Sequence, residues 1–154
     1  MSEEKFPALN TLFAKLQARK ERQDIDIETW LTNFGSIPEA LAYSSIFWPQ
    51  FVEYQGCLLR SGFDSAVFES CMQDLQGNRE AIERLMNHQH LTAIFFNPEV
   101  EETPEQICQL GKLLQEMWTL KLQRDYPDLS VQVAFSWHNL EENEDAQITV
   151  YCQR

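Results

Sequence analysis

The amino-acid sequence predicts an α+β fold, with helices packed on one face of a small, mainly antiparallel sheet that ends in a C-terminal β-hairpin. Most of the chain carries apolar residues at helical spacing, whereas residues 131–137 and 147–152 alternate between apolar and polar types as half-buried strands do. The length of 154 residues, with 44% hydrophobic and 23% charged residues, is typical of one globular domain. We therefore expect residues 1–154 to form a single domain.

Two amphipathic helices are expected at the start of the chain. Between Pro7 and about Arg22, the large apolar residues share one helix face: Leu9, Leu12, Phe13 and Leu16. The other face of this segment is polar and basic. A second stripe follows an N-cap at Asp24 or Asp26 and precedes Gly35: Ile27, Trp30, Leu31 and Phe34.

A third helix and an extended segment follow. Ser36, with Glu39 three residues later, forms a capping-box pattern that opens a helix ending before Pro49. Residues 51–60 are rich in strand-forming types and are interrupted at Gln55-Gly56. That dipeptide indicates either a bulge or the tight turn of a hairpin.

The middle of the chain contains two more capped helices and one ambiguous segment. Asp64 is expected to cap a helix that runs down to Gly77, and Asn78 to cap another that continues to Gln89. The apolar run 91–96 fits a helix or a buried strand equally well, because it is too short for its periodicity to distinguish them.

The C-terminal third carries the clearest signals. Residues 103–106, Thr-Pro-Glu-Gln, combine a cap, a first-turn proline and a capping-box glutamine, so a long helix should follow and end by Tyr126. The two alternating segments, 131–137 and 147–152, are joined by the acidic loop 139–145. We expect them to pair as an antiparallel hairpin.

Charge and composition exclude several classes of function. With 24 acidic and 12 basic side chains the formal charge is −12, which repels phosphate backbones, so direct nucleic-acid binding is not expected. The sequence lacks a secretory signal pattern and an apolar run long enough to cross a bilayer, so a cytoplasmic location without membrane contact is expected. The scattered cysteines predict reduced, mostly buried thiols: Cys57, Cys71, Cys108 and Cys152.

No motif in the sequence assigns a catalytic residue, a metal ligand or a cofactor. Glycine-rich phosphate loops and nucleophile elbows are absent. His88 and His90 would point about 200° apart on a helix, which prevents chelation of one ion, although an extended backbone would place them on one face. Together with His138 and a thiol or carboxylate, they define an alternative function as a small metal-dependent or thiol hydrolase.

The main hypothesis is a noncatalytic protein-binding module, such as an adaptor, an inhibitor or an immunity-type protein, whose partner has a basic surface. Its predicted partner-binding residues are an acidic cluster and three aromatics: Glu141, Glu142, Glu144, Asp145, Trp48, Phe51 and Tyr54. A solvated hairpin loop and core aromatics are the competing structural interpretation. Imitation of nucleic acid by the acidic surface, and a role as an oligomer subunit, are further hypotheses.

Overall fold

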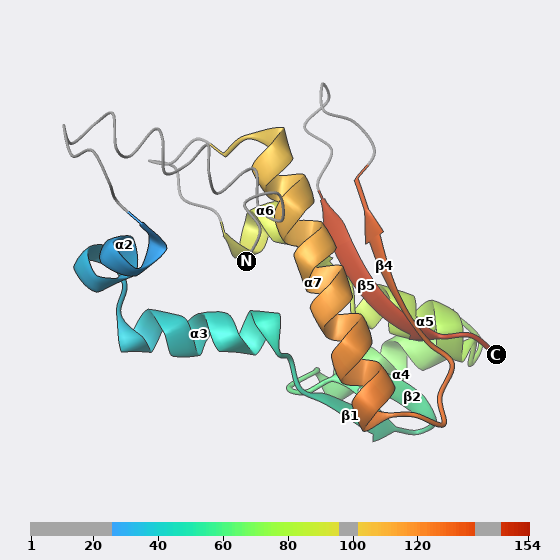
Figure 1. Cartoon of the computed structure of the whole chain (residues 1–154). Helices are drawn as coiled ribbons and strands as arrows, with labels where there is room; N and C mark the ends of the chain where they lie inside the picture. The colour runs from blue at the N-terminus through green and yellow to red at the C-terminus, as the bar shows by residue number, and fades with distance from the viewer. Residues whose placement is uncertain (1–25, 96–101, 138–145) are drawn as a thin grey trace.

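The computed structural model describes residues 26–95, 102–137 and 146–154 (Figure 1). The helix predicted between Pro7 and Arg22 and the acidic loop 139–145 lie outside these ranges. In the described residues, helices combine with a two-stranded and a three-stranded antiparallel sheet, which confirms the α+β class. The pairing of the last two strands confirms the C-terminal hairpin partners.

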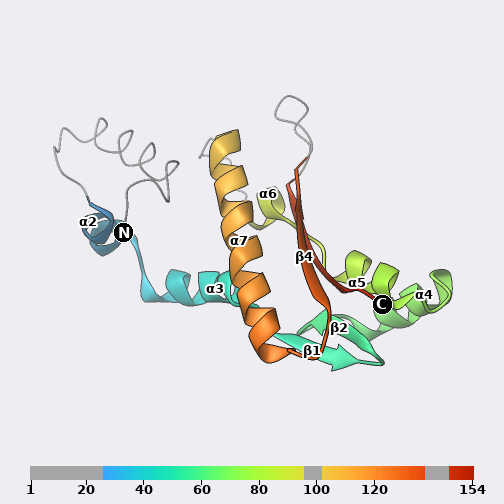
Figure 2. The ribbon, with the colours of Figure 1, turned by 45° about the vertical axis from the view of Figure 1, so that its right-hand side comes forward.

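The first two helices of the described residues form an arm that extends away from the sheets and α7 (Figures 1 and 2). Helix α2 spans Ile27–Phe34 and helix α3 spans Ile37–Phe47. Asp26 caps α2 by accepting a hydrogen bond of 2.7 Å from the backbone N–H of Thr29, and Ser36 caps α3 as predicted. We call residues 26–48 the helical arm.

A tight β-hairpin follows the arm. Strand β1, Phe51–Tyr54, pairs with strand β2, Cys57–Arg60. Gln55 and Gly56 between them have φ angles of 48° and 78°. Two consecutive residues with positive φ are typical of a two-residue hairpin turn, so the turn is observed and the bulge is not.

The long helix and the last two strands form the centre of the fold. Helix α7, Pro104–Asp125, starts at the predicted capping box of Thr103. Strands β4, Val131–Ser136, and β5, Gln147–Cys152, pair antiparallel, with Val133 opposite Val150. Helix α7 covers one face of this pair, and the ring of Phe135 lies so close to Gly111 that a Cβ atom there would overlap it.

The middle segment differs from the sequence prediction at one boundary. Helix α4, Ser65–Asp74, and helix α5, Arg79–Met86, start where predicted, but α5 does not reach Gln89. Instead, Gln89–His90 forms the two-residue strand β3, which pairs with the start of β5. The edge of β5 supplies backbone hydrogen-bond partners to this segment, and a continued α5 helix could not use them. The ambiguous run forms a short helix, α6, Leu91–Ile94.

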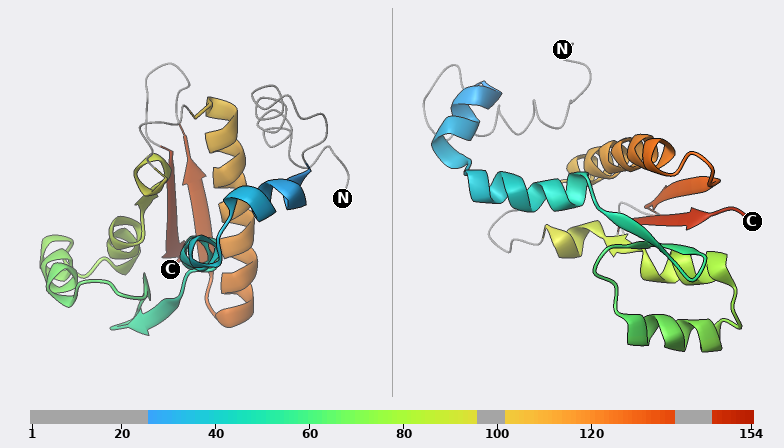
Figure 3. Two further views of the ribbon diagram at one scale, coloured as in Figure 1. Left: turned by 90° about the vertical axis from the view of Figure 1, so that its left-hand side faces the viewer. Right: turned by 90° about the horizontal axis from the view of Figure 1, so that it is seen from below.

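Two hydrophobic clusters hold these elements together. The larger one lies between α7 and the sheet and contains Leu114, Trp118 and Val150. The smaller one lies between the β1–β2 hairpin and helices α4 and α5, around Leu59 and Phe68. Figure 3 shows α7 on one side of the β4–β5 pair and α5, followed by α4, on the opposite side.

A buried carboxylate on α5 joins the two sheets. Glu83 is fully buried, and its two oxygens accept hydrogen bonds of 2.7 Å from the backbone N–H groups of Leu58 in β2 and Cys152 in β5. The guanidinium of Arg154 pairs with the same carboxylate at 2.8 Å. The charge of Glu83 is therefore compensated inside the protein, as a buried ion requires.

Asn87, one helical turn after Glu83, makes the second connection. Its amide oxygen accepts from the backbone N–H of Arg60, and its amide nitrogen donates to the carbonyls of Leu58 and Val150 at 2.7 and 3.0 Å. The side chains of Glu83 and Asn87 bond backbone groups at the edges of β2 and β5, which a neighbouring strand would otherwise pair. We call Glu83 and Asn87 the polar bridge.

Candidate protein-binding surface

The helical arm exposes an unusual amount of apolar surface. Among the described residues, seven of the eleven exposed large hydrophobic side chains belong to it: Ile27, Leu31, Phe34, Ile37, Leu41, Tyr43 and Trp48. Neither α2 nor α3 contains a fully buried residue. Exposed apolar side chains are ordinary when scattered, but a concentration of them on one element is typical of an interaction surface.

Helix α2 presents its apolar stripe without an extensive contact to another described element. Ile27, Leu31 and Phe34 follow the spacing that places residues on one face of a helix, and each is about half exposed. The ring of Trp30 lies 5.7 Å from that of Phe34, between centroids, and extends the same stripe. This apolar face is therefore only partly buried.

Helix α3 is attached to the body through its C-terminal half, where the ring centroid of Tyr43 also lies 6.1 Å from that of Phe95. Ile46 and Phe47 pack against the larger core, and the indole N–H of Trp118 donates a 2.9 Å hydrogen bond to the carbonyl of Ile46. Ile37 and Leu41, one turn apart, remain 78% and 66% exposed. The C-terminal half fixes α3 on the body, while Ile37 and Leu41 in the N-terminal half remain largely in solvent.

The arm carries only negative charge. It contains Asp26, Glu28 and Glu39, and residues 26–48 include no lysine or arginine. The hydrogen bond from the Thr29 backbone N–H lowers the pKa of Asp26 from its ordinary value, so this carboxylate stays charged at neutral pH. The surface of α2 and α3 is therefore apolar and acidic, whereas the cations of Lys121 and Arg124 lie beside Trp48, after the end of α3.

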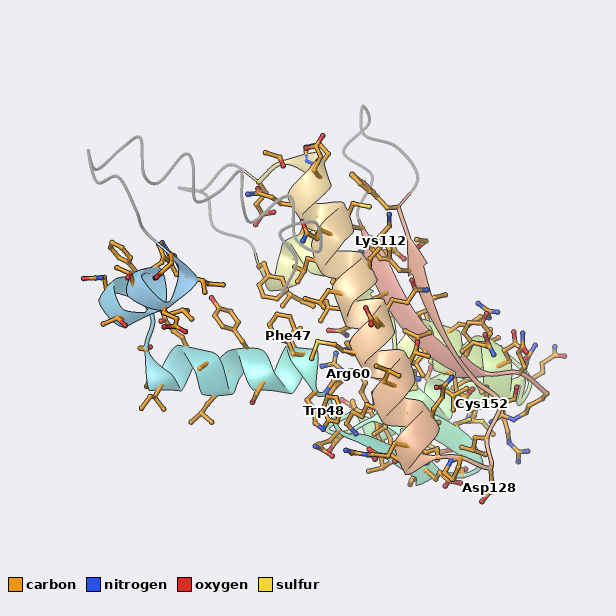
Figure 4. The ribbon with its side chains drawn as sticks, in the orientation of Figure 1. Phe47, Trp48, Arg60, Lys112, Asp128 and Cys152 are labelled. Atoms are coloured by element: carbon orange, nitrogen blue, oxygen red, sulfur yellow. The ribbon has the colours of Figure 1, made fainter. Side chains whose placement is uncertain are left out.

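The three predicted aromatic anchors occupy different environments. Trp48, labelled at the end of α3 in Figure 4, is 38% exposed. The cationic groups of Lys121 and Arg124 lie 5.8 Å and 5.1 Å from its ring centroid. Phe51 is only 5% exposed and meets Trp118 edge to face, so its ring belongs to the core. Tyr54 is partly buried against the smaller cluster. Of the three, Trp48 has the most surface for a partner.

The predicted acidic anchors, Glu141, Glu142, Glu144 and Asp145, lie outside the described residues. The apolar residues of α2 and α3 were not among the predicted binding residues, because a regular stripe normally predicts a buried face. A usable signal was present in residues 37–47, where apolar residues surround the helix and only Glu39 is charged. The apolar side chains of such a helix need packing partners on more than one side.

The residues of the alternative hydrolase hypothesis are only partly assembled. The Nε2 atoms of His88 and His90 lie 3.0 Å apart, whereas His138 falls outside the described ranges. Within those ranges, no cluster of three or more histidine, cysteine or acidic side chains is arranged to hold a metal ion. The thiols of Cys57, Cys71 and Cys152 are buried, which confirms their predicted place in the core.

The Cys152 thiol should react slowly with alkylating reagents in the folded protein. Burial, followed by the negative charge of Glu83, raises its pKa from 9.0 to about 11. At pH 8 the thiolate fraction is then about 0.1%, against roughly 10% for an unperturbed thiol, so iodoacetamide should modify Cys152 at least about 100-fold more slowly than in the unfolded chain. Mass spectrometry of the Cys152 peptide measures both rates.

The raised pKa of Cys152 also makes the stability of the protein depend on pH. Because the folded state holds the Cys152 proton more tightly than the unfolded state, the contribution of this thiol to the free energy of unfolding should be constant below pH 9 and should be lost as the pH rises from 9 towards 11. Alkylation of Cys152 at equal rates in the folded and unfolded protein would show that the thiol is accessible and ionised.

Comparison with protein-family models, with curated proteins and with solved structures finds no match to this chain. None of the described helices combines the length and apolar character needed to cross a membrane.

Proposed function

We propose that this chain is a noncatalytic protein-binding module that uses the helical arm to hold a partner with apolar and basic side chains. The observation that carries the proposal is the concentration of exposed apolar residues on α2 and α3, in a segment that contains three acids and no lysine or arginine of its own. An adaptor and an immunity-type inhibitor are both forms of this function. The acidic residues 141–145 would add steering towards the same basic partner.

The energetic reason lies in the apolar side chains. Full burial of a leucine, isoleucine or phenylalanine side chain is worth roughly 1.5–3 kcal/mol. In addition to Trp48, the arm leaves six large apolar or aromatic side chains between 42% and 78% exposed. Covering even part of this surface would supply enough free energy for a specific complex, after the cost of association has been met.

The acidic character of the arm selects among partners. Asp26, Glu28 and Glu39 would repel an acidic surface and attract lysine and arginine. A basic amphipathic helix satisfies both requirements, since its apolar stripe can lie along α2 and α3 while its cations face the three acids. Two other occupants have related chemistry: a second copy of the chain, and the chain's own segment from Pro7 to Arg22.

The test uses the full chain and a synthetic amphipathic peptide of leucine and lysine with apolar residues at helical spacing. Leu31→Glu combined with Leu41→Glu should weaken peptide binding at least about tenfold, because two apolar contacts are replaced by buried charges. Isothermal titration calorimetry measures the affinity. A peptide with glutamate in place of lysine should bind neither the unaltered chain nor this double variant.

The matched control is Val67→Glu combined with Leu120→Glu, which adds the same two charges at exposed apolar positions of α4 and α7. It should bind the peptide as the unaltered chain does. Equal weakening by both variants, or no binding by the unaltered chain, would contradict the proposal.

Two outcomes would assign the arm to another occupant and so reject a separate partner. If the unaltered chain sediments as a dimer that Leu31→Glu with Leu41→Glu dissociates, the arm binds a second copy. If the peptide binds only after Leu12→Glu and Leu16→Glu are introduced, the chain's own N-terminal segment covers the arm.

A further inference from the structure

His88, between α5 and β3, lies side by side with His90, the last residue of β3. The Nε2 atoms of the two imidazoles are 3.0 Å apart, and the rings meet at an interplanar angle of 80°. The arrangement arises because α5 ends at Met86, so the chain is extended at Gln89–His90. A helix through this segment would have turned the two side chains to different sides.

The hydrogen bonds around His88 determine where its lone pair points. Its Nδ1 atom lies 2.6 Å from the carbonyl oxygen of Leu85. A carbonyl oxygen only accepts, so Nδ1 carries the hydrogen and donates it, and Nε2 of the neutral ring holds a lone pair directed towards His90. An imidazole whose Nδ1–H is held by a backbone carbonyl is the usual form of a histidine metal ligand.

We propose that His88 and His90 form a two-histidine site for a divalent late-transition-metal ion, with water in the remaining coordination positions. The ion would replace the hydrogen bond between the two Nε2 atoms, and the proton that His90 holds on Nε2 would move to its Nδ1 atom. No third residue is required. The site does not involve the helical arm, so its test does not depend on the proposed function.

The separation of the two nitrogens indicates which ions fit best. With metal–nitrogen bonds of about 2.0–2.1 Å, a nitrogen separation of 3.0 Å corresponds to an angle of about 94° at the metal. Neighbouring ligands of square-planar or octahedral ions such as Cu²⁺ and Ni²⁺ meet near this angle, whereas a tetrahedral Zn²⁺ site needs nitrogens roughly 3.3–3.4 Å apart. We therefore expect Ni²⁺ to bind at least as tightly as Zn²⁺.

The experiment is a calorimetric titration of the full chain with Ni²⁺, which avoids the oxidation of thiols by Cu²⁺. His88→Gln and His90→Gln should each weaken binding at least about tenfold, while His138→Gln should leave the affinity unchanged. Thermal unfolding without metal checks that each variant is folded. In a second measurement on the unaltered chain, paramagnetic Ni²⁺ should broaden the amide resonances of Gln89 and Gln147, which lie beside and opposite His90.

Several results would overturn the site. One is Ni²⁺ binding that the two substitutions leave unchanged, and another is broadening centred elsewhere in the protein. An equal loss of affinity in His138→Gln would replace the two-histidine site by the three-histidine arrangement of the hydrolase hypothesis. A dissociation constant weaker than about 1 mM would mean that the pair serves only as a hydrogen bond.

Discussion

Glu83→Ala should lower the free energy of unfolding by about 3–5 kcal/mol, the range for removing one partner of a buried charge pair. The substitution leaves the backbone N–H groups of Leu58 and Cys152 without their acceptor and removes the partner of Arg154. An unsatisfied buried donor costs about 1–3 kcal/mol, so two of them account for most of the effect. Urea unfolding followed by circular dichroism measures the change.

Glu80→Ala is the matched control on the same helix. Glu80 also pairs with an arginine, Arg84, but both side chains are partly exposed, and such pairs one turn apart contribute about 0.3–0.5 kcal/mol. Glu80→Ala should therefore cost about 0.5 kcal/mol or less. If the two substitutions have similar effects, the polar bridge does not hold the two sheets together.

Trp118→Ala should be similarly destabilising, by about 3–5 kcal/mol, because it removes the largest side chain of the core. The indole is 1% exposed and meets Phe51 edge to face. It also donates the hydrogen bond to Ile46 that fixes the end of the helical arm. Chemical denaturation gives the loss, and hydrogen exchange at α3 reports whether the arm has become less well attached.

Two comparison variants separate these contributions. Leu120→Ala alters an exposed residue on the same helix and should change the stability by less than about 0.5 kcal/mol. Trp118→Phe keeps much of the packing but loses the N–H group, so it should cost less than Trp118→Ala while still increasing exchange in α3. Unchanged exchange in both tryptophan variants would mean that the arm is held by other contacts.

Short-range chemistry was sufficient to predict most element starts. Asp26, Ser36, Asp64, Asn78 and Thr103 all cap helices as expected, because a cap depends on a side chain and a backbone N–H only two or three residues away. The alternation in residues 131–137 and 147–152 likewise predicted β4 and β5. The α+β class follows from these local patterns.

The candidate sites depended on contacts between distant segments. The stripe of Leu31 and its neighbours shows that a helix has an apolar face, but the pattern is the same whether that face meets a core or solvent. The end of α5 was misplaced because the edges of β2 and β5, which Asn87 joins, are far apart in the sequence. The proximity of His88 and His90 follows from that helix end.

Within the described residues, the amino-acid order determined the identity of most elements through caps, turns and periodicity, but not that of β3 or α6. The packing of remote elements determined which apolar face is covered, which carboxylate is buried and which side chains meet. The physical reason is range: capping and turn geometry act over a few residues, whereas burial and strand-edge pairing depend on segments that only folding brings together.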